Sequence, residues 1–389
     1  MLRTLTAAAV VLNFSVISAA SAEIPSYTIQ VLGPHLQGFG MNEHGDVVGR
    51  KVVSGNQGFA FIAKAGGTVD LLPTPAQWNG SDAYAINDSG VVVGAVTTSG
   101  IATVGSRAAV WYPTRSGYEF ALLGALPTHT YSTALGVNNL GDIVGGSGGI
   151  GLGLYTNAVL FTGGTVLDLP GISLAADVNN SRVVIANNTL LDLDTMNTTT
   201  IPLPPGIWQG MISGDINNVG GFCGSIAGFS GCSTFPLIYM PDTGWDFVGG
   251  CATTTAASSI NDQGDTLTFV VSGGFNAVFF DEGVVNIPAL IAPGQGNWFL
   301  TGMSIINNNR DILASAKLLP DNITQLIRLV PIETGGVIGD LNGDLIVDGS
   351  DLAMFLGQWG SAGGDADFDG NGLVDAADLS VLLGAWSGK

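Results

Sequence analysis

The feature that most constrains the fold of this chain is a turn motif that recurs seven times. An apolar residue precedes Asn-x-x-Gly, and two apolar residues and often a second Gly follow; the copies begin at Asn42, Asn87, Asn138, Asn179, Asn217, Asn261 and Asn307. Their spacings are 45, 51, 41, 38, 44 and 46 residues, close to the length of one four-stranded propeller blade. The repeats therefore predict a seven-bladed β-propeller over residues 23–331.

Each copy has the pattern of two antiparallel strands joined by a tight turn. An apolar strand enters the turn, where Gly takes the left-handed conformation without steric cost, and a Val-rich strand leaves it. A third strand carries Ala and aromatic residues, as at residues 59–62, and a fourth ends near Pro or Gly, as at residues 201–204. Only 11% of the residues are charged and helical periodicity is nearly absent here, so we expect a mainly β fold.

The two ends of the repeat region complement each other. Strands are expected at residues 312–318 and 326–330 after the last copy, and no fourth strand follows them. A strand of the fourth type stands alone at residues 27–32, ahead of the first copy. Pairing of residues 27–32 with residues 326–330 would close a ring and cover exposed sheet edges. A linear β-solenoid is the alternative, although it gives no reason for a displaced strand.

The last part of the chain contains two acidic loops with the oxygen spacing of calcium sites. Both carry oxygen side chains at loop positions 1, 3, 5, 9 and 12, and a backbone carbonyl is expected at position 7. The predicted ligands are Asp340, Asn342, Asp344, Ile346 (carbonyl), Asp348 and Asp351, then Asp367, Asp369, Asn371, Leu373 (carbonyl), Asp375 and Asp378. The sequence therefore predicts two bound Ca²⁺ ions.

A helix is expected after each loop. Residues 352–359 and 379–386 carry apolar residues at helical spacing, and each run follows an acidic residue suited to a helix N-cap. A disordered acidic tail, the alternative, would not need two such helices. Gly372 stands at position 6 of the second loop, where the turn favours Gly, whereas Leu345 stands there in the first. We therefore expect tighter binding in the second loop.

The N-terminus has the pattern of a secretory signal peptide. Arg3 supplies a positive charge, residues 5–17 are largely apolar, and Ala20-Ser21-Ala22 is a small-x-small cleavage site. The apolar run is too short for a transmembrane anchor. We expect a secreted protein, extracellular or on the cell surface and without membrane insertion. Its predicted parts are a signal peptide (1–22), the propeller (23–331), a linker (332–339) and a calcium-binding α-helical module (340–389).

The charge of the chain limits its partners. The formal net charge is −20, with only 11 Lys and Arg residues. Nucleic acids and anionic membrane surfaces require clustered cations, because the protein must replace their counterions. Neither is therefore expected as a partner.

The cysteines are close together in the sequence. Cys223, Cys232 and Cys251 lie within 29 residues. In an oxidising exported environment, a disulfide between Cys223 and either Cys232 or Cys251 is plausible, and the odd count leaves one thiol.

Three tryptophans are candidate ligand-binding residues. Trp78, Trp208 and Trp298 occur in Pro- and Gly-rich connections between blades. Their rings could stack on sugar faces, or they could fill the space between blades.

The sequence offers no evident catalytic set. His35, His44 and His129 are the only histidines, and no nucleophile-elbow or HExxH pattern accompanies them. Many propeller carboxylates occur at repeat turns, where hydrogen bonds to their own backbone explain them. Two carboxylates from different blades could still form a glycosidase pair, since such a pair needs only a suitable separation in space. Because the sequence offers no evident catalytic set, we nevertheless expect a protein that is not an enzyme.

The repeat unit resembles the HAF-type extracellular repeats of bacterial secreted proteins. Their signature joins an Ala-Phe strand to an Asn-x-x-Gly-x-Val-Val-Gly turn, as in Phe59-Ala60 and residues 42–49. Arg182 and Arg310 replace the turn Gly in the fourth and seventh copies, where the resemblance is weakest. The resemblance implies an extracellular propeller-like architecture and no particular activity.

The C-terminal pair of loops resembles a type I dockerin, in which Asp is common at loop position 12. That resemblance implies attachment to a cohesin domain, but positions 10 and 11, Gly349-Ser350 and Ala376-Ala377, depart from the family's usual partner-reading pair. We therefore expect a secreted, non-catalytic binding or surface-assembly protein. Its expected partners are an extracellular glycan at the propeller and a cohesin-like or cell-surface protein at the C-terminal module. The alternatives are a dockerin-borne, polysaccharide-degrading glycoside hydrolase and a purely structural envelope protein.

Overall fold

The computed structural model describes the propeller strands and two C-terminal helices. The described residues are 25–55, 57–66, 68–98, 106–149, 155–204, 211–227, 234–247, 255–270, 275–280, 283–321, 323–332, 339, 341, 347–361, 366–368 and 372–386. The predicted signal peptide (1–22) lies outside this set.

The strands form seven four-stranded antiparallel sheets, which we call blades 1 to 7. Blade 1 contains β2 (Leu36–Met41), β3 (Val47–Ser54), β4 (Gln57–Ala63) and β5 (Val69–Leu71); blade 2 contains β6 (Gly80–Ile86), β7 (Val92–Thr97), β8 (Arg107–Thr114) and β9 (Gly117–Gly124). Blade 3 contains β10 (Tyr131–Val137), β11 (Ile143–Gly148), β12 (Asn157–Thr162) and β13 (Thr165–Asp168); blade 4 contains β14 (Asp177–Val178), β15 (Val183–Ala186), β16 (Thr189–Asp192) and β17 (Thr198–Thr200). Blade 5 contains β18 (Met211–Ile216), β19 (Phe222–Ala227), β20 (Thr234–Met240) and β21 (Gly244–Phe247); blade 6 contains β22 (Thr255–Ile260), β23 (Thr266–Val270), β24 (Phe275–Phe280) and β25 (Gly283–Asn286), with the 3-10 helix η1 (Ile287–Leu290) after it. Blade 7 contains β26 (Trp298–Ile306), β27 (Ile312–Leu318), β28 (Thr324–Ile332) and β1 (Ser26–Pro34).

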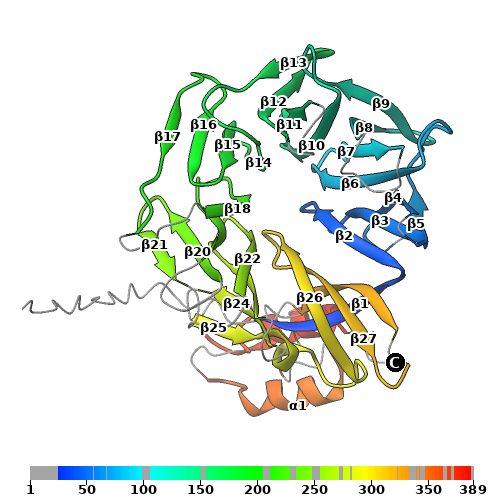
Figure 1. The fold of residues 1–389 in the computed structure, drawn as a ribbon. Helices are drawn as coiled ribbons and strands as arrows, with labels where there is room; N and C mark the ends of the chain where they lie inside the picture. The colour runs from blue at the N-terminus through cyan, green and yellow to red at the C-terminus, as the bar shows by residue number, and fades with distance from the viewer. Residues whose placement is uncertain are drawn as a thin grey trace, which may run out of the picture.

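The blades surround a central axis (Figure 1). The first strand of each blade (β2, β6, β10, β14, β18, β22 or β26) lies on the inner side of the ring, and successive strands lie farther out. This arrangement confirms the predicted mainly β, propeller fold. The linear solenoid is not observed.

The N-terminal strand closes the ring. β1 pairs antiparallel with β28, with Tyr27 opposite Pro331 and Ile29 opposite Leu329. Tyr27 is fully buried and packs with strands β26, β27 and β28 in one hydrophobic cluster. The predicted pairing of residues 27–32 with the last repeat is therefore confirmed.

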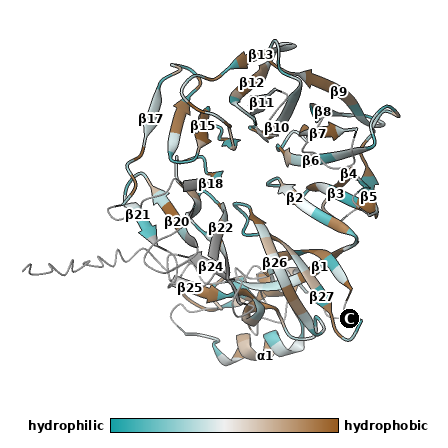
Figure 2. Cartoon of the chain, in the orientation of Figure 1, coloured by the Kyte–Doolittle hydropathy of each residue, from teal (hydrophilic) through white to brown (hydrophobic). Residues whose placement is uncertain are grey.

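Hydrophobic side chains fill the spaces between neighbouring blades. One cluster joins Val48 and Ile62 of blade 1 to Ala83 and Trp111 of blade 2. The Trp111 indole donates to the Pro73 carbonyl at 2.8 Å, and Trp245 of blade 5 makes the equivalent bond to Pro202 at 2.7 Å. Hydrophobic colouring accordingly recurs around the whole ring in Figure 2 rather than in one layer.

One predicted strand position is corrected. The fourth strand of blade 4 is β17 (Thr198–Thr200), not residues 201–204. Pro202 and Pro204 lack the N–H group that a strand donates to its neighbour, so the ladder ends before them.

The C-terminal region contains α1 (Gly349–Gly357) and α2 (Ala376–Gly384). Asp348 and Asp375 are their N-caps, and each forms a reciprocal capping box with an Asp three residues later. Phe355 of α1 and Leu382 of α2 belong to one buried cluster. Within the described part of the chain, neither helix has the length and hydrophobicity to cross a membrane.

We predict that deletion of residues 23–34 will cause association and lower the Tm. The deletion removes β1, which exposes the backbone edge of β28 and leaves a gap where Tyr27 packs. Size-exclusion chromatography and thermal unfolding should be compared with a chain that begins at Glu23. A truncated chain that stays monomeric with the Tm of this control would contradict the role assigned to β1.

Candidate functional site

The repeated asparagines form a closed ring at the centre of the propeller. We call Asn42, Asn87, Asn138, Asn179, Asn217, Asn261 and Asn307 the ring asparagines; all of them are buried. Each Nδ2 donates to the backbone carbonyl of the ring asparagine in the next blade, at 2.8–3.2 Å, and Asn307 returns to Asn42. The ring therefore links every blade to both of its neighbours.

The same amides also hold their own turns. Asn138 Oδ1 accepts from the backbone N–H groups of Leu140 and Asp142, at 3.0 and 2.9 Å. The other ring asparagines likewise accept from the N–H four residues later. A buried amide with its donor and acceptor both satisfied stabilises the structure, so the ring asparagines act as scaffold residues.

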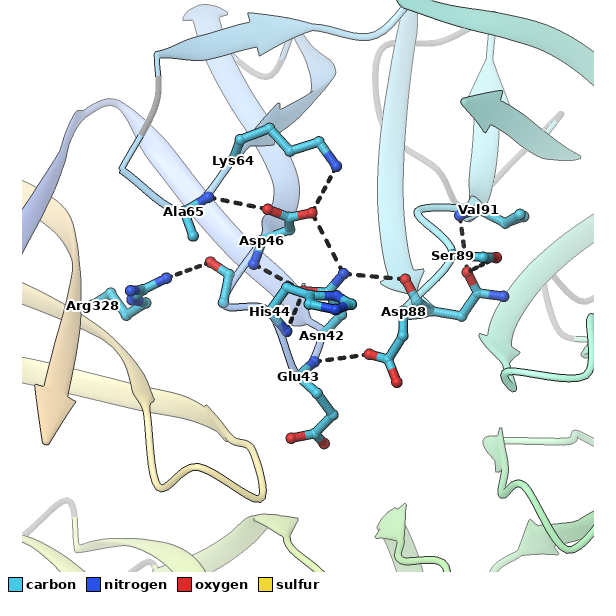
Figure 3. A network of polar contacts seen from close by, with 12 residues as sticks. Asn42, Glu43, His44, Asp46, Lys64, Ala65, Asp88, Ser89, Val91 and Arg328 are labelled. Carbon is cyan, nitrogen blue, oxygen red and sulfur yellow. Dashed lines mark hydrogen bonds and ion pairs between the residues drawn. The ribbon is translucent and has the colours of Figure 1, made fainter. Parts of the chain in front are cut away.

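The residues that follow the ring asparagines form a second closed ring. Each backbone N–H donates to the side-chain oxygen of the equivalent residue in the next blade, at 2.7–3.0 Å. The members are Glu43, Asp88, Asn139, Asn180, Asn218, Asp262 and Asn308. Figure 3 shows the part around Asn42, where Glu43 N–H meets Asp88.

This second ring places carboxylates in the lining of the central cavity. Glu43, Asp88 and Asp262 are its acidic members, and amides of Asn218 and Asn308 donate to Asp262 Oδ2 at 3.0 and 2.8 Å. Burial raises the pKa of Glu43 above its usual value, and the nearby carboxylates Asp88 and Asp262 contribute to the same shift. This part of the cavity lining is thus electronegative and rich in amide groups.

Ion pairs replace the missing turn glycines. Arg182 and Arg310 occupy the Gly position of blades 4 and 7 with φ of 61° and 63°, a conformation that costs a non-Gly residue roughly 1–2 kcal/mol. Arg182 pairs with Asp142 of blade 3 at 2.9 Å, and Arg310 pairs with the buried Asp265 of blade 6 at 2.7 Å. These links across blades offset the strain, so the turn persists without Gly.

The centre of the propeller contains a cavity of about 350 Å³, which we call the tunnel. Both rings line it, together with residues just before the ring asparagines. In six blades the inner strand has a β-bulge three residues before the ring asparagine, and five of these bulged residues line the tunnel: Phe39, Tyr84, Leu135, Gly214 and Ser258. A bulge redirects a side chain from the pleat, as is common beside active sites.

The tunnel has two unlike walls. Phe39 and Tyr84, with ring centroids 5.8 Å apart, and the neighbouring Leu135 form what we call the aromatic wall. Asp177, Asp215 and Ser258 on blades 4 to 6 form the polar wall. The buried Ser258 Oγ has no hydrogen-bond partner among the described residues. The aromatic wall can therefore pack against an apolar face of a ligand while the polar wall forms hydrogen bonds with polar groups of the same ligand.

The two aspartates of the polar wall differ in their surroundings. Asp215 Oδ2 accepts from the Ser259 hydroxyl at 2.8 Å and from the Ile260 N–H at 3.2 Å. Burial, then the Asp215 charge, raises the pKa of Asp177 well above its usual range.

The two predicted tryptophans that the structure describes, Trp78 and Trp298, lie outside the tunnel lining. Trp78 packs against the cluster between blades 1 and 2, and Trp298 packs against the blade 7 cluster. The Trp298 indole donates to the Gln295 carbonyl at 2.9 Å. Trp208 falls outside the described residues. The two described indoles thus have packing roles, and a sugar-stacking role for them remains a prediction.

Only one of the three cysteines of the predicted disulfide is among the described residues. Cys223 is buried and unpaired among the described residues, and burial raises the pKa of its thiol. Cys232 and Cys251 lie outside those residues.

Half of the predicted calcium ligands are described. They are Asp348, Asp351, Asp367, Leu373, Asp375 and Asp378, whereas Asp340, Asn342, Asp344, Ile346, Asp369 and Asn371 fall outside the described set. The described residues contain no group of three or more His, Cys, Asp or Glu placed to hold a metal ion. Asp351 and Asp378 are fully buried at the first turn of α1 and α2.

Comparison with solved structures identifies the same fold elsewhere. A structure titled as a streptogramin B lyase matches with 12% identity and a TM-score of 0.50, over 79% of this chain and 98% of that chain. Virginiamycin B lyase from Staphylococcus aureus (12%, 0.48, 79% and 100%) and an oligogalacturonate lyase in complex with manganese (10%, 0.49, 79% and 91%) also match. No protein-family model and no curated protein sequence matches.

These matches correct one expectation. At this identity they show the β-propeller fold alone, yet the fold is shared with a protein titled as a lyase. The sequence-based expectation that this chain is not an enzyme is therefore overturned: scarce histidines and missing hydrolase motifs do not exclude catalysis on this scaffold.

Sequence reasoning missed the tunnel residues. The repeat predicts these asparagines only as turn residues, because the sequence of a single repeat does not show the hydrogen bond that each of them makes to the next blade. The position three before each asparagine did carry a signal: it varies as Phe39, Tyr84, Leu135, Ala176, Gly214, Ser258 and Ser304, while the turn itself recurs. Variation at one position within a regular repeat marks the place where side chains are free to serve function.

We predict that Asn138→Ala will lower the free energy of unfolding by about 3 kcal/mol, because it leaves several buried backbone groups without partners. It removes the bonds to the Asn179 carbonyl and to Leu140 and Asp142. Denaturant unfolding should be compared with Asn197→Ala at an exposed turn, expected to change stability by less than about 0.5 kcal/mol. Equal, small losses in both variants would contradict the ring's role.

Proposed function

We propose that the propeller binds a small polyhydroxylated ligand, such as a sugar, in the tunnel. The observation that carries this proposal is the pairing of an aromatic wall with a polar wall in one cavity. Sugar rings present an apolar face of C–H groups and a rim of hydroxyls, so they suit both walls. The cavity of about 350 Å³ is at the lower end of small-molecule sites, which span roughly 300–1,000 Å³.

In this proposal, different tunnel residues contact different parts of the ligand. Tyr84 and Phe39 would lie against the apolar face, while Asp215 and Ser258 would hydrogen-bond hydroxyl groups. The second ring would admit the ligand past Glu43 and its amide neighbours. The ring asparagines, whose amides are already satisfied, would hold this geometry rigid.

We predict that Tyr84→Ala will weaken binding of a sugar ligand at least about tenfold, or ~1.4 kcal/mol, because it removes one of the two aromatic rings of the aromatic wall. A glycan array on the full chain would find the ligand, and calorimetry would measure the affinity. Tyr112→Ala on β8 is the matched control, since Tyr112 is exposed and outside the tunnel.

Unchanged affinity in Tyr84→Ala would contradict the tunnel site. The same samples should be examined for products by mass spectrometry. If the bound sugar is converted, and Asp215→Asn abolishes conversion but not binding, the tunnel is an active site. If no sugar binds, the structural envelope role becomes the better explanation.

We further propose that the C-terminal module binds two Ca²⁺ ions and attaches the exported protein to a cohesin-like or cell-surface protein. The supporting observations are the calcium-type oxygen spacing of the two loops and the position of Asp351 and Asp378, which are buried at the first turn of α1 and α2. Asp351 accepts N–H groups from Leu341 and Asp348, at 2.8 and 2.9 Å, which orients it toward its loop. The ions would hold the loop carboxylates together.

The two helices offer a surface for such a partner. Trp359 and Trp386, which follow α1 and α2, are 48% and 39% exposed, and Leu356 and Leu383 are also exposed. A signal peptide at residues 1–22 would export the protein, and residues 332–339 would link the module to the propeller. In this proposal the calcium module anchors the chain while the propeller binds its ligand.

We predict two calcium-binding events in calorimetry of the full chain, and loss of the tighter one in Asp378→Ala. The second loop should be tighter because Gly372 has a φ of 89°, which a non-Gly residue adopts only with strain. Asp242→Ala, at an exposed turn of blade 5, is the control and should keep both events. Absence of any calcium heat from the wild-type chain would refute the proposal.

A further inference from the structure

The acidic residues of the tunnel are not paired with basic residues. Besides Asp177, the described lining contains the carboxylates of Glu43, Asp88, Asp215 and Asp262, and it contains no Lys, Arg or His. The ion pairs among the described residues involve other acidic side chains: Asp46, Asp82, Asp142, Asp194, Asp265 and Asp311. The basic side chains of these pairs therefore serve aspartates outside the lining.

Neutral groups are the hydrogen-bond partners of the tunnel carboxylates. Glu43 Oε2 accepts from the Asn308 N–H at 2.9 Å, and Asp88 Oδ1 accepts from the Glu43 N–H at 3.0 Å. N–H groups and one hydroxyl are likewise the donors to Asp215 and Asp262. These donors stabilise carboxylates without supplying a positive charge. A cationic group on a ligand would supply that charge.

Three of the carboxylates lie in one arc of the second ring. The second-ring residue is acidic in blades 6, 1 and 2, which carry Asp262, Glu43 and Asp88. Blade 7, between blades 6 and 1, has Asn308, whose N–H donates to Glu43 and whose amide donates to Asp262 at 2.8 Å. In blades 3 to 5 the residue is Asn. The negative charge of the second ring is therefore gathered on one part of its circumference.

A cationic group would be stabilised in two ways beside blades 1 and 2. Phe39 and Tyr84 of the aromatic wall come from the same two blades as Glu43 and Asp88, four residues earlier in each. The face of an aromatic ring attracts a cation, and a carboxylate pairs with it. A cation there would also favour the ionised form of Glu43, whose pKa burial raises. A carboxylate on a ligand would instead meet like charge.

The placement of the carboxylates favours an organic cation over a metal ion. Calcium takes roughly six to eight oxygen ligands around one point. Within the described ranges, no three His, Cys, Asp or Glu side chains are placed to hold one ion, and Asn308 separates two of the second-ring carboxylates. An ammonium group has three N–H donors and can bind one or two carboxylates while the rest of its ligand packs on the aromatic wall.

We infer that the tunnel prefers a sugar with a free ammonium group, which binds between the carboxylates of Glu43 and Asp88 and the aromatic wall. This inference names the ligand class of the proposed sugar site and rests on that function. The hydroxyl groups of the same sugar would bind the polar wall, where Ser258 Oγ has no partner among the described residues.

The test measures the affinity of the full chain for glucosamine, glucose and glucuronic acid by calorimetry at about pH 7. These sugars share one ring form and differ in charge. We expect glucosamine to bind at least about tenfold more tightly than glucose, and glucuronic acid to bind least tightly. Added salt should weaken glucosamine binding more than glucose binding, because salt screens charge interactions.

Failure of the inference can be distinguished from failure of the proposed function. If glucose or another neutral sugar binds as tightly as glucosamine, the preference is overturned and the sugar site stands. If no sugar binds, on a glycan array or in calorimetry, both are overturned.

Asp88→Asn tests where the ammonium group binds. Asn already occupies this ring position in blades 3, 4, 5 and 7, where its Oδ1 accepts the N–H of the preceding blade, so the variant should keep the ring. We expect glucosamine affinity to fall at least about fivefold more than glucose affinity. Asp70→Asn on the exposed part of β5 is the matched control and should keep the wild-type preference. An undiminished preference in Asp88→Asn would overturn the inference.

Two further measurements complete the test. If Asp88→Asn does not fold, Glu43→Gln takes its place with the same expected result, and equal salt dependence of glucosamine and glucose binding in the wild-type chain would overturn the inference. A metal ion is the competing occupant. A third calcium-binding event in calorimetry, lost in Asp88→Asn and competing with glucosamine, would assign the carboxylates to a metal and would also overturn it.

Discussion

The hydrogen bond from each ring asparagine to the next blade is the interaction on which the rest of this structure depends. One amide donates across the blade boundary and accepts from its own turn, so it fixes the turn and the contact between blades together. Asp would lack the donor, and Gln would extend one carbon too far for the turn. Closure of the ring from Asn307 to Asn42, supported by β1 on β28, makes each bond depend on the blades beside it.

The residues that hold the blades together are different from the bulged residues that line the tunnel. Because the turns and the two rings fix the inner ends of the blades, the bulged residues before them can differ without loss of the fold. Phe39, Tyr84 and Leu135 gather on one side of the tunnel, and Asp177, Asp215 and Ser258 gather on the other. The sevenfold repetition thus produces a cavity that is not symmetric, as recognition of an asymmetric small molecule requires.

The carboxylates of this acidic chain are stabilised in several different ways. Asp142 and Asp265 are paired with arginines that also replace turn glycines. Asp262 is held by neighbouring amides, and Asp215 accepts from the Ser259 hydroxyl and the Ile260 N–H. Asp351 and Asp378 are buried at helix starts, where we propose calcium as the counter-charge. With few basic residues in the chain, carboxylates must be stabilised by amides, hydroxyl groups or ions.

The sequence alone determined the repeat, the propeller and the closing strand, because local turn chemistry and strand order recur in every copy and leave residues 27–32 as the missing element. It did not determine the fourth strand of blade 4, where prolines ended the ladder early. It also led to the expectation of a protein that is not an enzyme, which the fold does not support, since motifs from other folds say little about this one. Only the tertiary structure brought Phe39 to Tyr84. These partners lie 45 residues apart, and their contact depends on bulges and ring closure, which no single repeat encodes.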